Sequence, residues 1–370
     1  MKAMSRVARN MPADPTVAWN SNHTKITVQN HTILISKYIE QVKQSLLSLS
    51  RTLDENILFG IEFPPGSFDL PDDVSETNDI NTHAFGLFTI PSESSSLLNW
   101  NNHPATFFLE KLCDAGELCA RRENSIIWDV QHVNQWLLEI SEAWAEALTL
   151  IHLLAIPGRG TEVTTWQHTN SAASPRHLFR SSTLQTLITQ SNYNKTTAIT
   201  GRHKHILRVI PFTLSVIITK LLRVVRPIES LAFTSLNIEN ASGTREVYST
   251  YMFVSHGRVW GSNTLSACLR RWFLRELDVP FGLHLHRHFA QALQRQFLRY
   301  EKDHELADVA NEVMGHGQEV ADHNYAREGQ DLSLDSTTRR KMEIVGYDWI
   351  SKVHEIEVSP RDKGKGKARV

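Results

Sequence analysis

Residues 315–325 read GHGQEVADHNY and place a tyrosine, Tyr325, nine residues after the histidine of a Gly-His pair. Two other charged groups precede this stretch: residues 284–288 read HLHRH, and residues 158–162 read GRGTE. A tyrosine hydroxyl with a pKa near about 10 becomes a good nucleophile only when neighbouring groups hold its oxygen or take its proton. The stretch therefore raises the hypothesis that Tyr325 is a nucleophile assisted by the histidines and arginines of these groups.

Two arginines, Arg159 and Arg287, stand in the upstream groups. Their planar guanidinium groups stay charged at any working pH and bind two oxygens at once, which suits a phosphate whose oxygens gain negative charge during reaction. Arg287 by itself is also typical of a surface ion pair, but its position in a His-x-x-Arg-His pattern favours the phosphate role. Two such side chains suit the binding of one phosphate group if the fold brings them together.

In their order and residue types, these groups resemble the catalytic set of the tyrosine recombinases, the phage integrase superfamily. The matching positions are Arg159, Glu162, His284, Arg287, His288, His316 and Tyr325. The resemblance covers about residues 126–330, and the wording around residues 157–162 is also similar to fungal Crypton-like transposon recombinases. Two departures are Gly160 inside the first motif and the long interval of 29 residues from Arg287 to His316.

The resemblance implies DNA breaking and rejoining, as in site-specific recombination or DNA integration. Tyr325 would attack phosphorus and form a 3′-phosphotyrosine, which keeps the bond energy, so that rejoining requires no cofactor and no metal. By the same resemblance, His284 would accept a proton or contact the phosphate, and His316 would donate a hydrogen bond to it. Glu162 would orient Arg159 or its helix through an ion pair, and His288 would pack or hydrogen-bond inside the domain.

A lysine on a hairpin completes the set in that family by protonating the 5′-hydroxyl leaving group. Lys195 lies before a turn that contains Gly201, and Lys204 follows the turn, so either lysine is a candidate for this role. Both residues, together with Arg202 and Arg208, are also predicted to contact DNA.

The distribution of charge agrees with a DNA partner, although the whole chain has a net charge of only −1. Residues 195–299 contain 15 Lys and Arg against 5 Asp and Glu, whereas residues 1–150 contain 10 against 19. Basic blocks release counterions from the DNA backbone and so supply affinity. An ordinary solvated, arginine-rich surface remains the alternative interpretation of the basic block.

Three other functional interpretations remain open. His284 and His288 are four residues apart and would face one another on a helix as zinc ligands, but no Glu follows the first histidine and no Cys is near. A domesticated or inactive DNA-binding module would keep the phosphate pocket without turnover, and the acidic N-terminal part favours it. A type IB topoisomerase-like enzyme would use the same chemistry as a monomer.

The periodicity of apolar residues predicts a mainly α fold with a small antiparallel β-sheet, an α+β class. We expect a loop-rich N-terminal region at 1–125 as a short or degenerate helical DNA-binding domain, a catalytic domain at 126–330, and a C-terminal helix with a basic tail at 331–370. Helices are predicted at 36–58, 104–118, 126–154, 211–225, 264–277, 305–314 and 336–353, and after His284. Residues 163–211 are expected to form the sheet, and residues 1–35 to be irregular.

The remaining expectations concern surroundings. The most apolar run, Val209 to Ile218, contains a proline and is far shorter than the roughly 20 residues of a membrane helix, so no membrane partner is expected. Three cysteines without a metal-binding spacing fit a reducing compartment. The resemblance implies double-stranded DNA as the partner, a homodimer or homotetramer on that DNA, and a nuclear location, or the nucleoid in a prokaryote.

Overall fold

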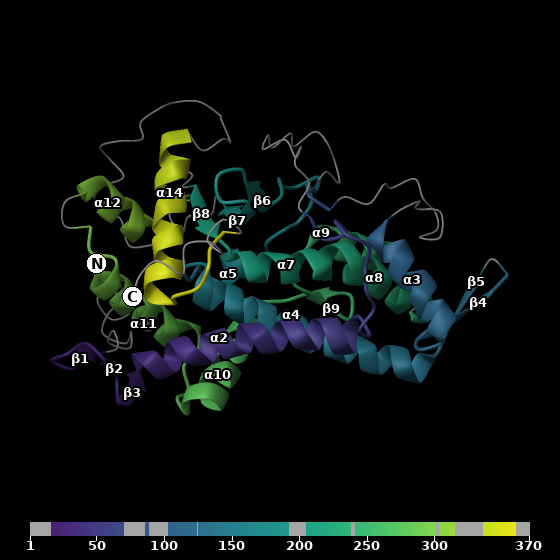
Figure 1. Cartoon of the computed structure of the whole chain (residues 1–370), viewed down its shortest axis with the longest axis horizontal. Helices are drawn as coiled ribbons and strands as arrows, with labels where there is room; N and C mark the ends of the chain where they lie inside the picture. The colour runs from purple at the N-terminus through teal and green to yellow at the C-terminus, as the bar shows by residue number, and fades with distance from the viewer. Residues whose placement is uncertain are drawn as a thin grey trace, which may run out of the picture.

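The computed structural model describes residues 16–69, 86–88, 103–123, 125–191, 205–237, 241–300, 303–314 and 336–359. Within these residues the protein is mainly helical and carries small antiparallel sheets, as the sequence predicts (Figure 1). The α-helices are α2 (Ile35–Thr52), α3 (Pro104–Ala115), α4 (Val130–Leu154), α5 (Gly160–Thr164), α7 (Phe212–Lys220), α8 (Arg226–Leu236), α9 (Ala241–Thr250), α10 (Ser262–Leu277), α11 (Leu283–Phe297), α12 (His304–Val313) and α14 (Ser336–Asp348). Single π-helical turns extend three of them: η1 (Leu53–Ile57), η3 (Leu221–Val225) and η5 (Trp349–Val353).

The strands form short antiparallel sheets at different places on the helical body. Their bounds are β1 (Val17–Trp19), β2 (Lys25–Val28), β3 (His31–Leu34), β4 (Cys119–Arg122), β5 (Ser125–Trp128), β6 (Leu178–Ser181), β7 (Thr186–Ser191), β8 (Ile206–Val209), β9 (Val254–Ser255) and β10 (Arg258–Val259). The sheet β6-β7-β8 pairs Leu178 with Thr189 and Ile188 with Val209. Strands β7 and β8 are buried along their whole length, which fixes this sheet firmly inside the fold.

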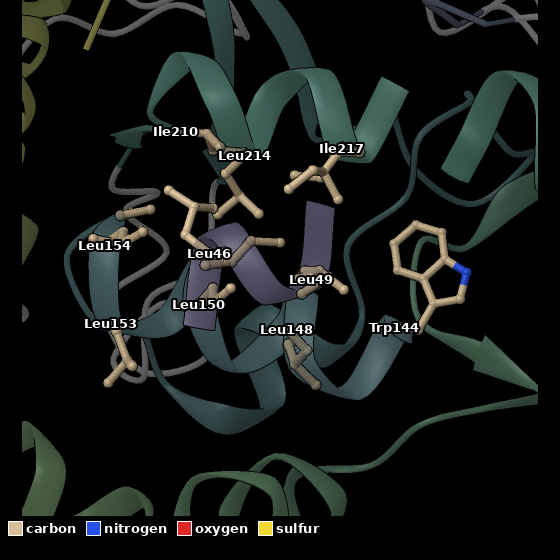
Figure 2. Packing of buried hydrophobic residues seen from close by; sticks show 14 of the residues in the cluster. Leu46, Leu49, Trp144, Leu148, Leu150, Leu153, Leu154, Ile210, Leu214 and Ile217 are labelled. Atoms are coloured by element: carbon tan, nitrogen blue, oxygen red, sulfur yellow. The ribbon is translucent and has the colours of Figure 1, made fainter. Parts of the chain in front are cut away.

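The centre of the molecule is the long helix α4, packed between α2 and α7. Figure 2 shows Leu46 and Leu49 of α2, Leu150 and Leu154 of α4, and Leu214 and Ile217 of α7 gathered in the space between the three helices. The labelled residues there are Leu46, Leu49, Trp144, Leu148, Leu150, Leu153, Leu154, Ile210, Leu214 and Ile217. Each such buried side chain contributes about 1.5–3 kcal/mol relative to exposure, so the contact between these helices stabilises the fold substantially. Helix α4 ends at Leu154, five residues before Arg159 in the sequence, so its packing fixes the point at which the chain leaves the core toward Arg159.

Buried tryptophans tie neighbouring elements to this centre. The indole of Trp136 donates to the carbonyl of Ile57 at 3.0 Å, and that of Trp349 donates to the carbonyl of Leu153 at 3.2 Å. Trp272 on α10 donates to the hydroxyl of Ser45 on α2 at 2.8 Å. Each bond satisfies a polar group that burial would otherwise leave at a cost. The bonds join the C-terminal turn η5 and helix α10 to the central helices.

Four local predictions are wrong. The helix predicted from residue 126 begins only at Val130, because residues 125–128 form strand β5 of the hairpin β4-β5. Residues 1–35 are not wholly irregular, because β1, β2 and β3 form a sheet in which alternate residues such as Ile26 and Val28 are buried. Val163 belongs to α5 and not to a strand. The helix predicted at 211–225 does not end there: it continues through η3 into α8, and Pro227 stands at the start of α8, where the shifted hydrogen bonds of the π-helical turn accommodate a residue without an N–H group.

One hydrophobic cluster runs through the described residues. It includes Ile26 of the N-terminal region, Leu150 and Leu214 of the predicted catalytic domain, and Val353 near the C-terminus. The described parts of the three predicted regions therefore share a core. Every helix among the described residues is too short or too polar to cross a bilayer.

Candidate functional site

The first motif lies where α4 gives way to the short helix α5. Ile156 adopts a left-handed backbone conformation with φ of 57°, and the chain then passes through Pro157 and Gly158. Arg159 takes the N-cap position in extended conformation, and the carboxylate of Glu162 accepts its backbone N–H at 3.3 Å. A carboxylate in the first turn also suits the positive end of a helix. Arg159 therefore stands at the start of a new helical turn.

Two glycines allow other elements to approach this turn closely. A Cβ atom on Gly160 would lie 2.8 Å from Leu283 Cδ2 and 2.8 Å from Ser262 Cβ, at the starts of α11 and α10. A Cβ atom on Gly158 would lie 2.7 Å from Val163 Cγ2 and 3.2 Å from the guanidinium of Arg208. All four distances are shorter than the ordinary contacts of a Cβ atom. The small residues around Arg159 thus bring it next to the helix that carries the second motif.

Glu162 is bound to Arg208 and not to the side chain of Arg159. The two groups form an ion pair in which each side chain is only 2% exposed. Arg208 also donates from Nε to the carbonyl of Ile156 at 2.9 Å, and Ser191 donates to Glu162 at 2.6 Å. Arg208, which we expected among the DNA contacts, therefore has its guanidinium inside the protein, where it braces the loop before Arg159.

The environment of Glu162 keeps it ionised. Burial by itself would raise the pKa of this carboxyl, but the charge of Arg208 and the hydrogen bonds from Ser191 and the Arg159 backbone outweigh burial and lower the pKa below its usual value. An ionised carboxylate accepts several hydrogen bonds at once. Glu162 thus joins β7, β8 and the N-terminus of α5 around one anion.

Arg287 on α11 lies close to the same group. Burial lowers the pKa of its guanidinium, and the positive charges of Arg159 and Arg208 lower it further. Glu162, the carboxylate whose charge opposes this effect, is already held by Arg208. One carboxylate, bound to Arg208, thus faces the charges of three arginines, Arg159, Arg208 and Arg287. The excess of positive charge favours an anion next to Arg159 and Arg287.

Arg287 also connects α11 to the end of α12. Its Nη2 donates to the carbonyl of Met314 at 3.3 Å. Met314 is the residue directly before Gly315-His316 in the sequence. A direct hydrogen bond therefore joins the second motif to the residue that precedes the third motif in the sequence.

A pair of buried histidines holds the loop before Arg159 against α11. His152 of α4 approaches the carbonyl of Gly158 through Nε2 at 3.2 Å and His286 through Nδ1 at 3.0 Å. Burial lowers the pKa of His152 to about 3 and that of His286 well below its usual value, so both rings are neutral. Because a carbonyl only accepts, His152 carries its proton on Nε2 and accepts from Nδ1–H of His286. Among the described residues, Nε2 of His286 is then left without a partner.

The two outer histidines of residues 284–288 are more accessible. His284 is exposed, and its ring contacts that of His288 with 4.7 Å between the ring centroids. His288 is half-buried, and the packing role expected of it stays a prediction. Across the described part of the chain, no group of three or more His, Cys, Asp or Glu side chains has a geometry for a metal ion.

The remaining predicted site residues lie outside the described residues: Lys195, Arg202, Lys204, His316 and Tyr325. The first three belong to the connection between β7 and β8 in the sequence, and the last two to the connection between α12 and α14. Their roles stay predictions. Four described residues escaped the sequence interpretation or were assigned differently: His152, Ser191, Arg208 and His286. A buried-strand pattern around Arg208 was the one available signal, since arginine in an apolar run demands a carboxylate partner.

Comparisons of this chain with protein-family models, with curated proteins and with solved structures gave no match.

Proposed function

We propose that the protein breaks and rejoins DNA strands through a covalent 3′-phosphotyrosyl intermediate on Tyr325, as the tyrosine recombinases do. The observation that carries the proposal is the close packing of the turn that carries Arg159 against the start of α11, the helix that carries Arg287: a Cβ atom on Gly160 would lie 2.8 Å from Leu283 Cδ2. In keeping with this packing, the positive charge of Arg159 lowers the pKa of Arg287. Two like charges are brought together at a cost unless an anion is to lie between them. A phosphodiester group is such an anion, and two guanidinium forks match its oxygens.

Two further observations support the proposal. Met314, whose carbonyl accepts a hydrogen bond from Arg287, stands two residues before His316 in the sequence. The connection that carries Lys195 begins at Ser191, whose hydroxyl is bound to Glu162. The segments that carry the two predicted donors, His316 to the phosphate and Lys195 to the leaving group, thus follow residues that are bound to Arg287 and to Glu162. We call Arg159, Arg208 and Arg287 the arginine cluster.

The chemistry then divides between the groups as follows. Arg159 and Arg287 bind the non-bridging oxygens and stabilise the negative charge of the transition state. Tyr325 forms the bond to phosphorus, and the 5′-oxygen leaves with a proton from Lys195 or Lys204. The reverse sequence rejoins the strand. Glu162 and Arg208 act indirectly, because they fix the loop and the helix start that carry Arg159.

A nicked suicide substrate tests this function. The full chain is incubated with duplex DNA in which cleavage releases a short oligonucleotide, so that the covalent complex accumulates and is separated on a denaturing gel. We expect an adduct with the wild type and with the control Tyr251→Phe, and none with Tyr325→Phe. An adduct that persists in Tyr325→Phe, or the absence of any adduct across a broad set of DNA sequences, would contradict the proposal.

The second candidate is a DNA-binding module that retains the pocket without turnover. The observation that favours it is the acidic balance of residues 1–150, which is unsuited to a clamp around DNA. This candidate predicts DNA binding that weakens steeply with salt, survives Tyr325→Phe and produces no strand cleavage. Arg287→Ala weakens binding in both cases, so the covalent adduct is the measurement that separates them.

A further inference from the structure

Two cysteines far from the arginine cluster lie in contact. Cys113 is in the last turn of α3, and Cys119 is the first residue of β4; their Sγ atoms are 3.3 Å apart. Both thiols are free. A disulfide bond is about 2 Å long, so a shift of little more than 1 Å would join them.

The backbone on both sides of the pair is fixed. Gly116 ends α3 in the left-handed conformation, with φ of 70°, and donates to the carbonyl of Leu112 at 3.0 Å. Cys119 is paired with Trp128 in the hairpin β4-β5, and Asp129 donates to the carbonyl of Leu118 at 2.9 Å. The short connection between the cysteines is thus held at both ends. The approach of the two sulfurs follows from these bonds and does not depend on a distant part of the chain.

The two thiols differ in access. Cys119 is 3% exposed, whereas Cys113 is half-buried and lines a cavity of about 300 Å³ together with Glu110, Asp114, Ala120 and Arg121. Burial, reinforced by the contact with Cys113, raises the pKa of Cys119. Cys113 is therefore the thiol that reacts first with a reagent from solution, and the buried Cys119 is placed to react with the modified Cys113.

We propose that Cys113 and Cys119 form a reversible intramolecular disulfide by exchange with a small disulfide such as oxidised glutathione. The thiolate of Cys113, having lost its proton to water, attacks one sulfur of the oxidised glutathione, and one glutathione thiolate leaves. Cys119 then loses its proton and attacks the sulfur of Cys113, which releases the second glutathione. The protein loses two electrons and two protons, and the glutathione disulfide is reduced to two thiols. Arg121 in the cavity wall offers a cationic contact for a glutathione carboxylate.

The link would join the end of α3 to the hairpin β4-β5. Only five residues separate the two cysteines in the sequence, so the link restricts the unfolded chain less than a link across a long loop does. Its main effect is local, on the hairpin that leads into the central helix α4. Cys268, the third cysteine, is buried on α10 next to Arg271 and serves as an internal control.

The test uses the folded full chain, reduced and then equilibrated with mixtures of reduced and oxidised glutathione. Remaining thiols are blocked with an alkylating reagent, and peptides are identified by mass spectrometry. We expect the wild type and Cys268→Ser to lose the mass of two hydrogen atoms in a peptide pair containing Cys113 and Cys119. Cys119→Ser is expected to stop at a glutathione adduct on Cys113, and Cys113→Ser to form neither product.

Three outcomes would overturn the proposal. They are a wild type that keeps both thiols in an oxidising mixture, an adduct on Cys119 that forms as readily as one on Cys113, and a link between Cys268 and either of the others. Thermal unfolding of each serine variant is measured in parallel. If the reduced variants unfold at the same midpoint temperature as the reduced wild type, the products come from the folded chain.

Discussion

In two arginine–glutamate pairs among the described residues both side chains are buried, yet the pKa values of the two carboxyl groups are shifted in opposite directions. At the arginine cluster, Arg208 holds Glu162 with a lowered pKa. In the second pair, Arg226 Nη1 lies 3.1 Å from Glu229 Oε2, but burial raises the pKa of Glu229 to about 7 against the opposing charge of Arg226.

Hydrogen bonds explain the difference. Glu162 accepts from Ser191, from Arg208 and from the backbone of Arg159. Glu229 receives a side-chain hydrogen bond from Tyr248, but within the described residues neither Arg226 Nη1 nor Glu229 Oε2 makes a well-aligned hydrogen bond, although the two atoms are close. A nearby opposite charge and a single further donor thus fail to compensate for burial, whereas several donors on the carboxylate succeed. The pair next to the proposed phosphate site is built to stay charged, and the other pair is not.

The largest expected effect is that of Glu162→Gln. The change leaves Arg208 buried without a counter-charge, and removing one partner of such a pair costs about 3–5 kcal/mol. Chemical denaturation at pH 7 measures the loss in the free energy of unfolding. Glu229→Gln is the matched control, and it should cost less than about 1 kcal/mol because that carboxyl is already partly protonated at this pH. Equal losses in the two variants would remove the distinction between the pairs.

Ser191→Ala tests the hydrogen bonds that set the pairs apart. A hydrogen bond to a charged group contributes about 1.5–3 kcal/mol, so the free energy of unfolding should fall by that amount. The control is Thr189→Val on the same strand, because the buried hydroxyl of Thr189 has no partner among the described residues. We expect this control to be neutral or slightly stabilising. A Ser191→Ala variant that unfolds like its control would show that Arg208 alone keeps Glu162 ionised.

Gly158→Ala disturbs the same pair through space. The added methyl group meets Val163 Cγ2 at 2.7 Å and Arg208 Nη2 at 3.2 Å, and overpacking of this kind costs about 1–3 kcal/mol. Gly261→Ala, where the methyl group enters open space, is the control and should cost only tenths of a kcal/mol. Combining Gly158→Ala with Glu162→Gln should give less than the sum of the two losses. Strict additivity would mean that Gly158 acts independently of the pair.

Much of this arrangement could be predicted from the sequence, and the failures have a common cause. Local signals place Arg159 at a helix start after Pro157 and Gly158, and they predict α10, α11 and α12 within a few residues. The hairpin of β2 and β3 also has a local signal, since Ile26 and Val28 alternate with polar residues before a turn. Strands this short give only a weak pattern, and the hairpin was not predicted. Local pattern thus suffices for most elements.

The partner of a buried charge is not a local property. Arg208 lies 46 residues from Glu162 in the sequence, and β8 is buried on both faces, so alternation could not reveal which way its side chain points. The approach of His152 to His286 spans 134 residues. Such contacts depend on how whole helices pack, which explains why the motif residues were identified while their mutual bonds were not.

The smallest effect at neutral pH is expected from Glu229, and pH reveals it. The pKa of Glu229 is about 7 in the folded protein and near its usual 4.5 in the unfolded chain. Between these values the folded protein holds a proton that unfolding releases, so the free energy of unfolding falls as pH rises, by up to about 1.4 kcal/mol per unit. Glu229→Gln should abolish this decline. Buried histidines titrate in the same window, but their effects cancel in the difference between the unfolding free energies of variant and wild type.

Glu162→Gln should change this difference with pH only in the acidic range. The pKa of Glu162 is lowered in the folded protein, so the stabilisation that its ionised carboxylate provides is complete above about pH 4.5. Difference curves that coincide for the two variants would mean that both carboxyl groups titrate alike and that the hydrogen bonds do not distinguish the pairs.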